Sequence, residues 1–276
     1  MPKATPSTPF QPCGVITLTT DFGHKDPFVG VMKGQVLRRF PAARLIDLTH
    51  EILVHCPAEA GFWLGRSFGY FPPGTVHVAV VDPGVGSSRD IAVVEAEGQL
   101  FLAPDNGLLA GVLERLQAAP ILRRLEDDVL RELGIRRPSA TFHGRDIFAP
   151  LAAELAAGRL RPEALGPVVR ELAPGWLDVP VLAGGQLRGA VVTVDHFGNL
   201  LTNLDAALVA QVADPVVRAG GLEILLRRTY SDVPSGEYVA LINSFGVLEV
   251  ARVERSAAEG LGLGRGAPIV VSPRGG

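Results

Sequence analysis

The sequence contains few cysteines and no long apolar run, and each scarcity excludes a class of protein. Two cysteines, Cys13 and Cys56, in 276 residues provide neither a disulfide framework nor a metal-ligand spacing. We therefore expect a cytoplasmic setting and no bound metal. No apolar segment approaches membrane-spanning length, so we expect no membrane partner. Residues 1–14 are rich in proline and threonine and lack the apolar centre of a signal peptide, which indicates a flexible tail.

Positive charge is not in excess either. The 26 lysines and arginines face 29 aspartates and glutamates, for a net charge of −3, and the basic residues are scattered. A nucleic-acid-binding protein would instead show a basic patch, so we expect no nucleic-acid partner. A Gly-x-Gly-x-x-Gly motif does not follow the first predicted strand, which disfavours a dinucleotide-dependent oxidoreductase. The hydrophobic content of 47% is nevertheless ample for a packed core.

The stretch 80–89 is the most informative one for function. It lies between two runs rich in β-branched residues, 76–81 and 91–94, which predict buried strands. The segment between them holds Asp82, two glycines, two serines and finally Arg89. Glycines let a backbone approach a ligand closely, and open α/β sheets bind ligands at strand ends. The alternative is a tight turn in which nearby amides satisfy Asp82.

The first part of the chain alternates between predicted strands and predicted helices. The strands are expected at 15–20, 44–48, 76–81, 91–94 and 99–103. Helices are expected after Asp26-Pro27, with Val29, Met32, Val36 and Leu37 on the apolar face, and at 57–68, 108–116 and 147–157. Residues 120–138 are charged and less regular. The alternation predicts an α/β domain with a largely parallel sheet over residues 15–175.

The pattern changes after a linker-like segment at about 176–184. Short alternating or apolar runs broken by turns predict strands at 187–194, 222–228, 237–242, 247–253 and 268–272. A helical period is present at 204–212. Residues 185–276 are therefore expected to form a small antiparallel β-barrel-like domain.

Four further polar clusters adjoin predicted strands or helices. Asp21 ends the first strand, where a carboxylate can accept hydrogen bonds from ribose hydroxyls, although a simple turn or cap is equally open. The run 142–146 opens a helix, where backbone amides favour negative charge, although Asp146 could instead be a cap.

The runs 195–199 and 243–246 combine amides with an aromatic ring, which suits adenine or another flat heterocycle. Asx-type hairpin turns would have the same composition.

Taken in order, these motifs closely resemble those of the S-adenosylmethionine (SAM) hydroxide adenosyltransferases, the adenosine-forming SAM hydrolases. The motifs are Thr19–Gly23, Asp82–Gly86 with Arg89, Phe142–Asp146, Asp195–Asn199 and Asn243–Gly246. Each is weak alone, but the ordered set is specific and covers nearly the whole chain from about residue 15. The family is a fold relative of the SAM-dependent fluorinase and chlorinase. The resemblance implies an N-terminal α/β domain, a C-terminal β-barrel and a homotrimer with active sites at subunit interfaces.

The resemblance also implies a reaction. Water or hydroxide attacks the 5′ carbon of SAM, which releases L-methionine and leaves adenosine, and no cofactor is needed. The catalytic aspartate, arginine and histidine of the family match Asp82, Arg89 and His143. A histidine near its ordinary pKa can take a proton from water, Asp82 could orient the histidine or the water, and Arg89 could hold hydroxide-like charge. The sequence leaves open which of the three accepts the proton.

By the same resemblance, residues of both predicted domains bind the substrate. In the N-terminal domain these are Asp21 for the ribose, Asp26 for the amino-acid end of SAM, and Phe22. The C-terminal domain contributes Asp195 and Asn199 for the methionine amino and carboxylate groups, Phe197 and Tyr230 for stacking on adenine, and Asn243, Ser244 and Phe245.

Two other functions remain open from the sequence. The SAM-dependent halogenases carry a Tyr/Thr-type halide pocket where this chain has Asp82 and Val85. A fixed carboxylate there would repel fluoride or chloride, which favours water as the nucleophile. A non-catalytic SAM- or adenosine-binding protein would use the same pocket without turnover, but binding alone does not require a water-activating set such as Asp82, Arg89 and His143.

Overall fold

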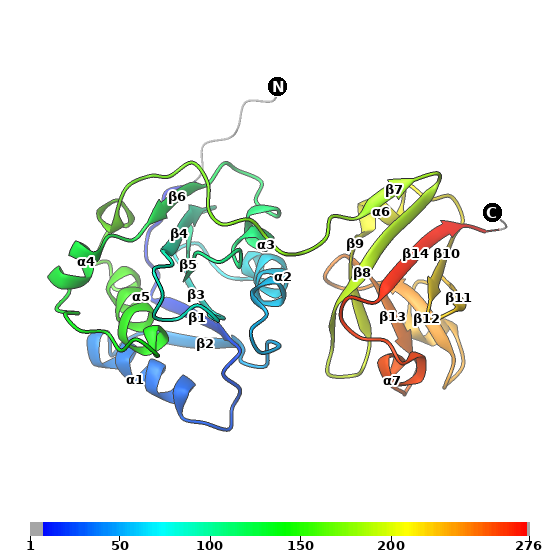
Figure 1. Ribbon diagram of the computed structural model, residues 1–276, viewed down its shortest axis with the longest axis horizontal. Helices are drawn as coiled ribbons and strands as arrows, with labels where there is room; N and C mark the ends of the chain where they lie inside the picture. Colours follow the sequence, from blue (N-terminus) through cyan, green and yellow to red (C-terminus); the bar gives the residue numbers. More distant parts are fainter. Residues whose placement is uncertain (1–7, 275–276) are drawn as a thin grey trace. The chain divides into compact units, whose positions relative to one another are not determined.

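The computed structural model describes residues 8–274, and the chain divides into an N-terminal unit ending at Trp176 and a C-terminal unit beginning at Leu177 (Figure 1). Residues 1–7 of the expected tail lie outside the described residues. The rest of that segment is bonded to the N-terminal unit, because the Phe10 N–H donates to the Glu95 carboxylate (3.2 Å) and the Cys13 N–H to the Gly74 carbonyl (3.1 Å).

The N-terminal unit contains a six-stranded sheet in the order β2-β1-β3-β5-β4-β6. Its strands are β1 (Val15–Thr20), β2 (Arg44–Thr49), β3 (Val76–Val80), β4 (Ile91–Ala96), β5 (Gln99–Pro104) and β6 (Ile121–Arg124). The four strands β2, β1, β3 and β5 are mutually parallel, which confirms the prediction of a largely parallel sheet. Strand β4 runs antiparallel to both of its neighbours.

The expected alternation of strands and helices fails at β4 and β5, which form a hairpin. Glu97 and Gly98 make its two-residue turn, and both have positive φ angles, 52° and 74°. A two-residue hairpin turn of the commonest type requires a positive φ at both of its central residues. No helix separates β3, β4 and β5, so the loop at residues 81–90 connects two strands directly.

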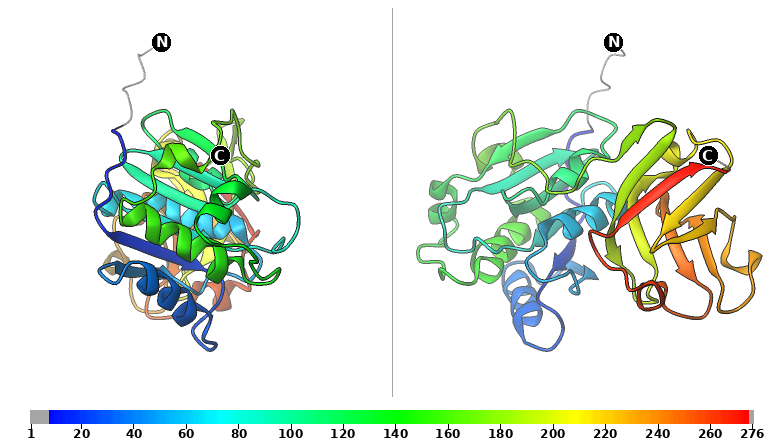
Figure 2. Two further views of the ribbon diagram at one scale, coloured as in Figure 1. Left: turned by 90° about the vertical axis from the view of Figure 1, so that its left-hand side faces the viewer. Right: turned by 45° about the vertical axis from the view of Figure 1, so that its right-hand side comes forward.

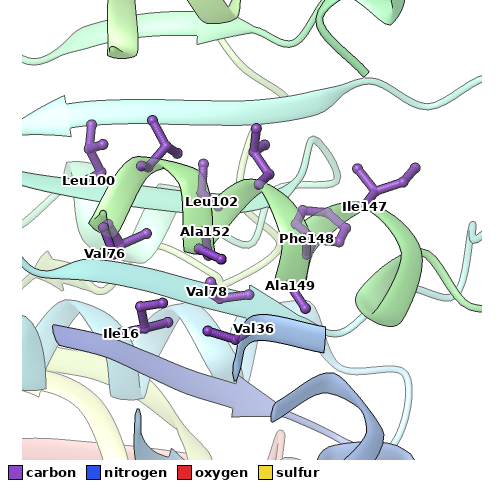
Figure 3. Packing of buried hydrophobic residues seen from close by; sticks show 14 of the residues in the cluster. Ile16, Val36, Val76, Val78, Leu100, Leu102, Ile147, Phe148, Ala149 and Ala152 are labelled. Atoms are coloured by element: carbon purple, nitrogen blue, oxygen red, sulfur yellow. The ribbon is translucent and has the colours of Figure 1, made fainter. Parts of the chain in front are cut away.

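Helices cover both faces of this sheet (Figure 2). Helices α1 (Phe28–Arg39) and α5 (Ala149–Ala156) pack on one face, where Ile16, Val36 and Val78 share a core with residues of α5 (Figure 3). Helices α2 (Pro57–Ser67) and α3 (Ala110–Leu113) pack on the other. Two 3₁₀ turns (Phe68–Tyr70 and Pro162–Leu165) and α4 (Asp127–Glu132) complete the unit.

Several predicted details of these helices are wrong. Leu37 is 42% exposed, because successive helical residues differ by about 100° and it follows buried Val36 around the helix. The expected helix at 108–116 is reduced to α3, and the irregular segment 120–138 contains β6 and α4. Helix α5 is preceded by a π-helical turn, Gly144–Phe148, where an ordinary helix start was expected.

The C-terminal unit is an antiparallel sheet in the order β11-β10-β14-β8-β9-β13-β12, with β7 paired to β8. Its strands are β7 (Val181–Ala183), β8 (Gln186–Val194), β9 (Leu200–Asp205), β10 (Pro215–Ala219), β11 (Leu222–Leu225), β12 (Tyr238–Ile242), β13 (Val247–Arg252) and β14 (Pro268–Pro273). A bridge between Leu226 and Ala240 brings the two ends together, so the sheet nearly closes, as predicted.

Some strands of the C-terminal unit have no counterpart in the sequence prediction. Strands β9 and β10 were not expected, and in β9 the run Thr202-Asn203 interrupts the apolar pattern. The expected helix at 204–212 is reduced to α6 (Ala206–Val209). A second short helix, α7 (Ala257–Leu261), and a 3₁₀ turn, η4 (Tyr230–Asp232), lie between strands. Among the described residues, none of the helices could cross a membrane.

A buried histidine connects three neighbouring strands of the N-terminal sheet. The His77 ring on β3 is fully buried, stacks on Phe101 and bonds Thr17 Oγ1 through Nδ1 (2.8 Å) and Gln99 Oε1 through Nε2 (2.6 Å). The Gln99 amide nitrogen already donates to two carbonyls, so Oε1 is the acceptor and His77 carries its proton on Nε2. Burial lowers the pKa of His77 to about 4.

We expect this histidine to make the N-terminal unit sensitive to acid. In the unfolded chain His77 binds a proton near pH 6.5, but in the folded chain only near pH 4. The contribution of neutral His77 to the free energy of unfolding is therefore fully present above pH 6.5 and falls as the pH is lowered from 6.5 to 4. The loss reaches roughly 3 kcal/mol at pH 4. Urea unfolding at pH 7, 5 and 4 gives the free energy of unfolding of the wild type and of His77→Gln. The free energy of the variant should depend less on pH. Equal pH dependence in the two proteins would contradict this expectation.

Candidate active site

A cavity of about 270 Å³ opens at the carboxyl ends of β1 and β3. The two strands are parallel, with Thr20 beside Val80, so the segments that follow them leave the sheet at the same edge. The rest of the wall comes from the segment before α5 and the loop before α2. The lining residues are Asp21, Phe22, Phe28, Val54, His55, Val80, Asp82, Val85, Thr141, Phe142, His143 and Gly144.

Three side chains from two distant segments meet at this cavity. Arg89 Nε lies 3.0 Å from both carboxylate oxygens of Asp82, and its Nη2 also bonds one of them. The same Nη2 lies 2.7 Å from Nδ1 of His143, which comes 54 residues later in the chain. The Asp82 and Arg89 side chains are only 5% and 10% exposed, so water screens this ion pair weakly. The structure therefore brings together the three residues expected to be catalytic.

The loop that carries Asp82 and Arg89 is held by its own backbone. The Val85 N–H donates to the Asp82 carbonyl (3.2 Å), and the Ser87 N–H to that of Gly84 (3.1 Å). Gly86 has a φ of 78°, and a side chain there would place its Cβ 2.2 Å from the Ala140 carbonyl oxygen. Glycine is therefore required at this position, and it packs the loop against the segment that leads to His143.

His143 lies at the start of the π-helical turn before α5, near the Arg89 cation and the Asp82 and Asp146 carboxylates. Burial lowers its pKa below the ordinary value of 6.5, and the Arg89 guanidinium lowers it further, while Asp82 and Asp146 oppose the shift. Asp146 accepts from Arg145 (2.6 Å) and from the Ser139 N–H (2.8 Å). Asp146 therefore does not cap the helix start, as the alternative from the sequence had it, but binds Arg145 and the preceding segment, whereas His143 faces the cavity.

The other residues predicted in the N-terminal unit lie in different places. Asp21 lines the cavity, and its Oδ2 accepts the His55 N–H (2.9 Å). Phe22 also lines it, and its ring contacts Phe28 edge to face. Asp26 is exposed in the turn before α1. The structure therefore places Asp21 and Phe22, but not Asp26, at the cavity with Asp82 and His143.

A second cavity, of about 700 Å³, lies in the C-terminal unit. Its lining residues are Phe197, Asn199, Tyr230, Arg252, Val253, Glu254, Arg255 and Ser256. Phe197 is 75% exposed and Tyr230 43% exposed, so both rings are available to a flat ligand. Three predicted residues, Phe197, Asn199 and Tyr230, are thus brought together here.

Two of the predicted C-terminal motifs are also tight turns. The Asp195 carboxylate accepts the N–H groups of Phe197 (2.9 Å) and Asn199 (2.8 Å), and Oδ1 of Asn243 accepts that of Phe245 (3.0 Å). The turn interpretation that the sequence left open is therefore observed at both places. Ser244 is exposed at the tip of the second turn.

Sequence reasoning missed several residues at the two cavities. Phe28, Val54, His55 and Thr141 line the first cavity, but their sequence context gives no signal for it. Glu249 contacts both Tyr230 and Asn243 while only 2% exposed, and a carboxylate inside the apolar run of β13 could have drawn attention to it. Within residues 8–274, no group of three or more His, Cys, Asp or Glu side chains is arranged to hold a metal ion.

Comparison with known proteins identifies the family. The family model for the SAM hydroxide adenosyltransferase N-terminal domain matches residues 16–166, and the model for the C-terminal domain matches residues 189–270. An (R)-S-adenosyl-L-methionine hydrolase from Thermus thermophilus is 40% identical over 91% of this chain and 96% of its own length. A fluorinase from Actinopolyspora mzabensis is a more distant relative, 28% identical over 94% of this chain and 97% of its own.

A solved structure agrees with these matches. The crystal structure of an uncharacterized conserved protein from Thermotoga maritima superposes with a TM-score of 0.85, at 36% identity over 93% of this chain and 99% of that chain. Both domain models, the relatives and the fold thus agree with the resemblance seen in the motifs. The chain belongs to the SAM hydroxide adenosyltransferase family.

Proposed function

We propose that this protein hydrolyses SAM to adenosine and L-methionine by attack of water on C5′. Its relatives are named for the R form of the substrate, and we propose that form here. The observation that carries the proposal is the buried contact of Arg89 with both Asp82 and His143 beside a cavity that Asp21 also lines. A site that only bound a nucleoside would not need a paired carboxylate and imidazole at its wall.

The chemistry requires the protein to position and desolvate a water molecule. The sulfur of SAM is a sulfonium cation, so methionine leaves as a neutral thioether and needs no proton from the protein. The rate then depends on holding water in line with the C5′–S bond in a site with little competing solvent. The rings of Phe22 and Phe142 and the Val85 side chain supply apolar walls around Asp82 and His143.

The hydrogen bonds support a separate role for each of the three catalytic candidates. A guanidinium has only donors, so Nδ1 of His143 is the acceptor and the neutral ring carries its proton on Nε2. His143 thus offers an N–H, whereas the Asp82 carboxylate offers acceptor lone pairs. We therefore assign to Asp82 the hydrogen bond from the attacking water and the proton that this water loses as its oxygen bonds to C5′ and the C5′–S bond breaks. Arg89 fixes the orientation of both partners.

The two cavities support part of the proposed substrate contacts. Asp21 uses one carboxylate oxygen for the His55 N–H, and the other can accept from ribose hydroxyls. Phe197 and Tyr230 present ring faces suited to adenine. Asn199, whose amide donates to Asp195 (2.9 Å), is retained with Asp195 for the methionine amino and carboxylate groups. We retain Asp26, Asp195, Asn243, Ser244 and Phe245 as substrate-binding proposals that rest on the family motifs. A homotrimer with active sites between subunits is proposed on the same basis.

Isotope labelling tests the reaction. Incubation with (R)-SAM in ¹⁸O-labelled water should give adenosine with the label in its 5′-hydroxyl, because the oxygen that attacks C5′ comes from water. Mass spectrometry of the nucleoside measures this, and boiled protein is the control. Unlabelled adenosine or intact SAM would contradict the proposal. A parallel reaction with added fluoride or chloride tests the halogenase alternative, for which a 5′-halonucleoside would be the evidence.

Alanine substitutions test the catalytic assignment. Arg89→Ala and His143→Ala should lower kcat by about 10²- to 10⁴-fold while KM changes little, because Arg89 and His143 serve the attack of water and do not hold the bulk of SAM. Steady-state kinetics gives both constants, and thermal melting of each variant shows that it remains folded. Unchanged adenosine formation in both variants would make the assignment wrong.

The charge on Arg89 should be measurable in the titration of His143. In the wild type, burial and the guanidinium hold the pKa of His143 below 6.5, so the ring is neutral at pH 7 and binds a proton only on further acidification. Arg89→Met removes the cation and leaves Asp82, so the pKa of His143 should rise. NMR titration of the histidine ring protons measures both proteins. A pKa that is the same in the variant, or lower, would contradict the observed contact.

A further inference from the structure

A buried carboxylate lies among leucines in the barrel of the C-terminal unit. Glu249 lies in the middle of β13, is 2% exposed, and is paired across the sheet with Leu201 of β9 and Leu241 of β12. A leucine at this position would match its neighbours and would avoid the free-energy cost of removing a charge from water. Burial raises the pKa of the Glu249 carboxyl, which reflects that cost.

Both carboxylate oxygens of Glu249 are used by side chains from other segments. Oε1 accepts the hydroxyl of Tyr230 (2.7 Å), which belongs to the turn η4. Oε2 accepts from the amide nitrogen of Asn243 (3.0 Å), which follows β12. A single buried group therefore ties together two segments that are separate in the sequence.

Tyr230 lines the second cavity, and Asn243 begins a turn that the family motifs assign to substrate binding. The Tyr230 ring lines the 700 Å³ cavity together with Phe197. Because its hydroxyl is committed to Glu249, the phenol stays protonated, and burial and the carboxylate both raise its pKa. Asn243 in turn fixes the backbone of the following turn, since its Oδ1 accepts the N–H groups of Phe245 and Val247.

We propose that Glu249 is a positioning residue, which holds Tyr230 and the turn after Asn243 in the arrangement that binds the purine of a nucleoside. The Tyr230 hydroxyl points to Glu249, so the apolar face of its ring is left to the cavity. A flat heterocycle is the ligand that such a face binds by stacking. This inference rests on the proposed function for the identity of the nucleoside. It adds a residue that does not itself line the cavity.

Three variants of the full-length chain test the role of Glu249. Glu249→Met keeps much of the side-chain length but accepts no hydrogen bond, whereas Glu249→Gln can accept from Asn243 and donate to the tyrosine oxygen. Thr202→Val is the matched control, because Thr202 is fully buried on the neighbouring strand β9 and donates to the Leu248 carbonyl (2.8 Å). The Thr202 hydroxyl also accepts the Leu204 N–H (3.1 Å), so the variant removes two buried hydrogen bonds of the same sheet at a residue that does not line the cavity.

Calorimetric titration with adenosine and steady-state kinetics with SAM provide the readouts. Glu249→Met should weaken adenosine binding and raise KM by about tenfold or more, with kcat changed by less than about threefold, because the lost interaction serves binding and not the chemical step. Glu249→Gln should bind adenosine within about threefold of the wild type. Thr202→Val should melt at a lower temperature yet keep the wild-type affinity.

A fourth variant keeps the proposal testable if the Glu249→Met protein misfolds. Tyr230→Phe keeps the ring but releases it from the carboxylate, and it should weaken adenosine binding in the same direction. Wild-type affinity in both Tyr230→Phe and Glu249→Met would overturn the proposal, as would a wild-type chain that binds no adenosine. A wild-type chain that binds adenosine but leaves SAM intact would refute the hydrolysis alone, and the affinities of the variants would still decide the role of Glu249.

Discussion

The contact of Arg89 with both Asp82 and His143 sets the geometry of the N-terminal site. One guanidinium donates to a carboxylate and to an imidazole at once, so it fixes the distance between them and the tautomer of the histidine. The two partners come from different elements, the loop after β3 and the turn before α5, and parallel pairing of β1 with β3 places Asp21 at the same edge. The parallel strands thus place the site at one edge of the sheet, and the Arg89 guanidinium fixes the Asp82 and His143 side chains there.

Parts of this fold could be predicted from the sequence because they depend on local pattern. Strands β1, β3 and β5 are buried along their whole length, and runs rich in β-branched and apolar residues are expected of buried parallel strands. The β4–β5 hairpin was missed because its turn, Glu97-Gly98, depends on a non-glycine residue with positive φ, for which glutamate gives no signal. The π-helical turn at Gly144 was missed because it depends on packing around it and not on residue type.

The candidate site shows a similar division. Asp82, Arg89 and His143 could be named because their motifs resemble a family, and the structure brings the three together. Composition alone could not distinguish a binding motif from a turn at Asp195 or Asn243, and both side chains do cap turns. Glu249 could not be assigned from the sequence because its role depends on side-chain contacts, with Asn243 at the end of the paired strand β12 and with Tyr230 in the turn η4.

The π-helical turn Gly144–Phe148 has a consequence for how this protein can change over evolution. Such a turn contains one residue more than an α-helix would over the same rise, as if a residue had been inserted. Removing one residue here would restore a regular helix but would rotate everything before it by about 100° around the axis. His143 would then be turned away from Arg89 while the buried face of α5 stayed in place. The length of this segment is therefore constrained by the active site and not by the stability of the helix.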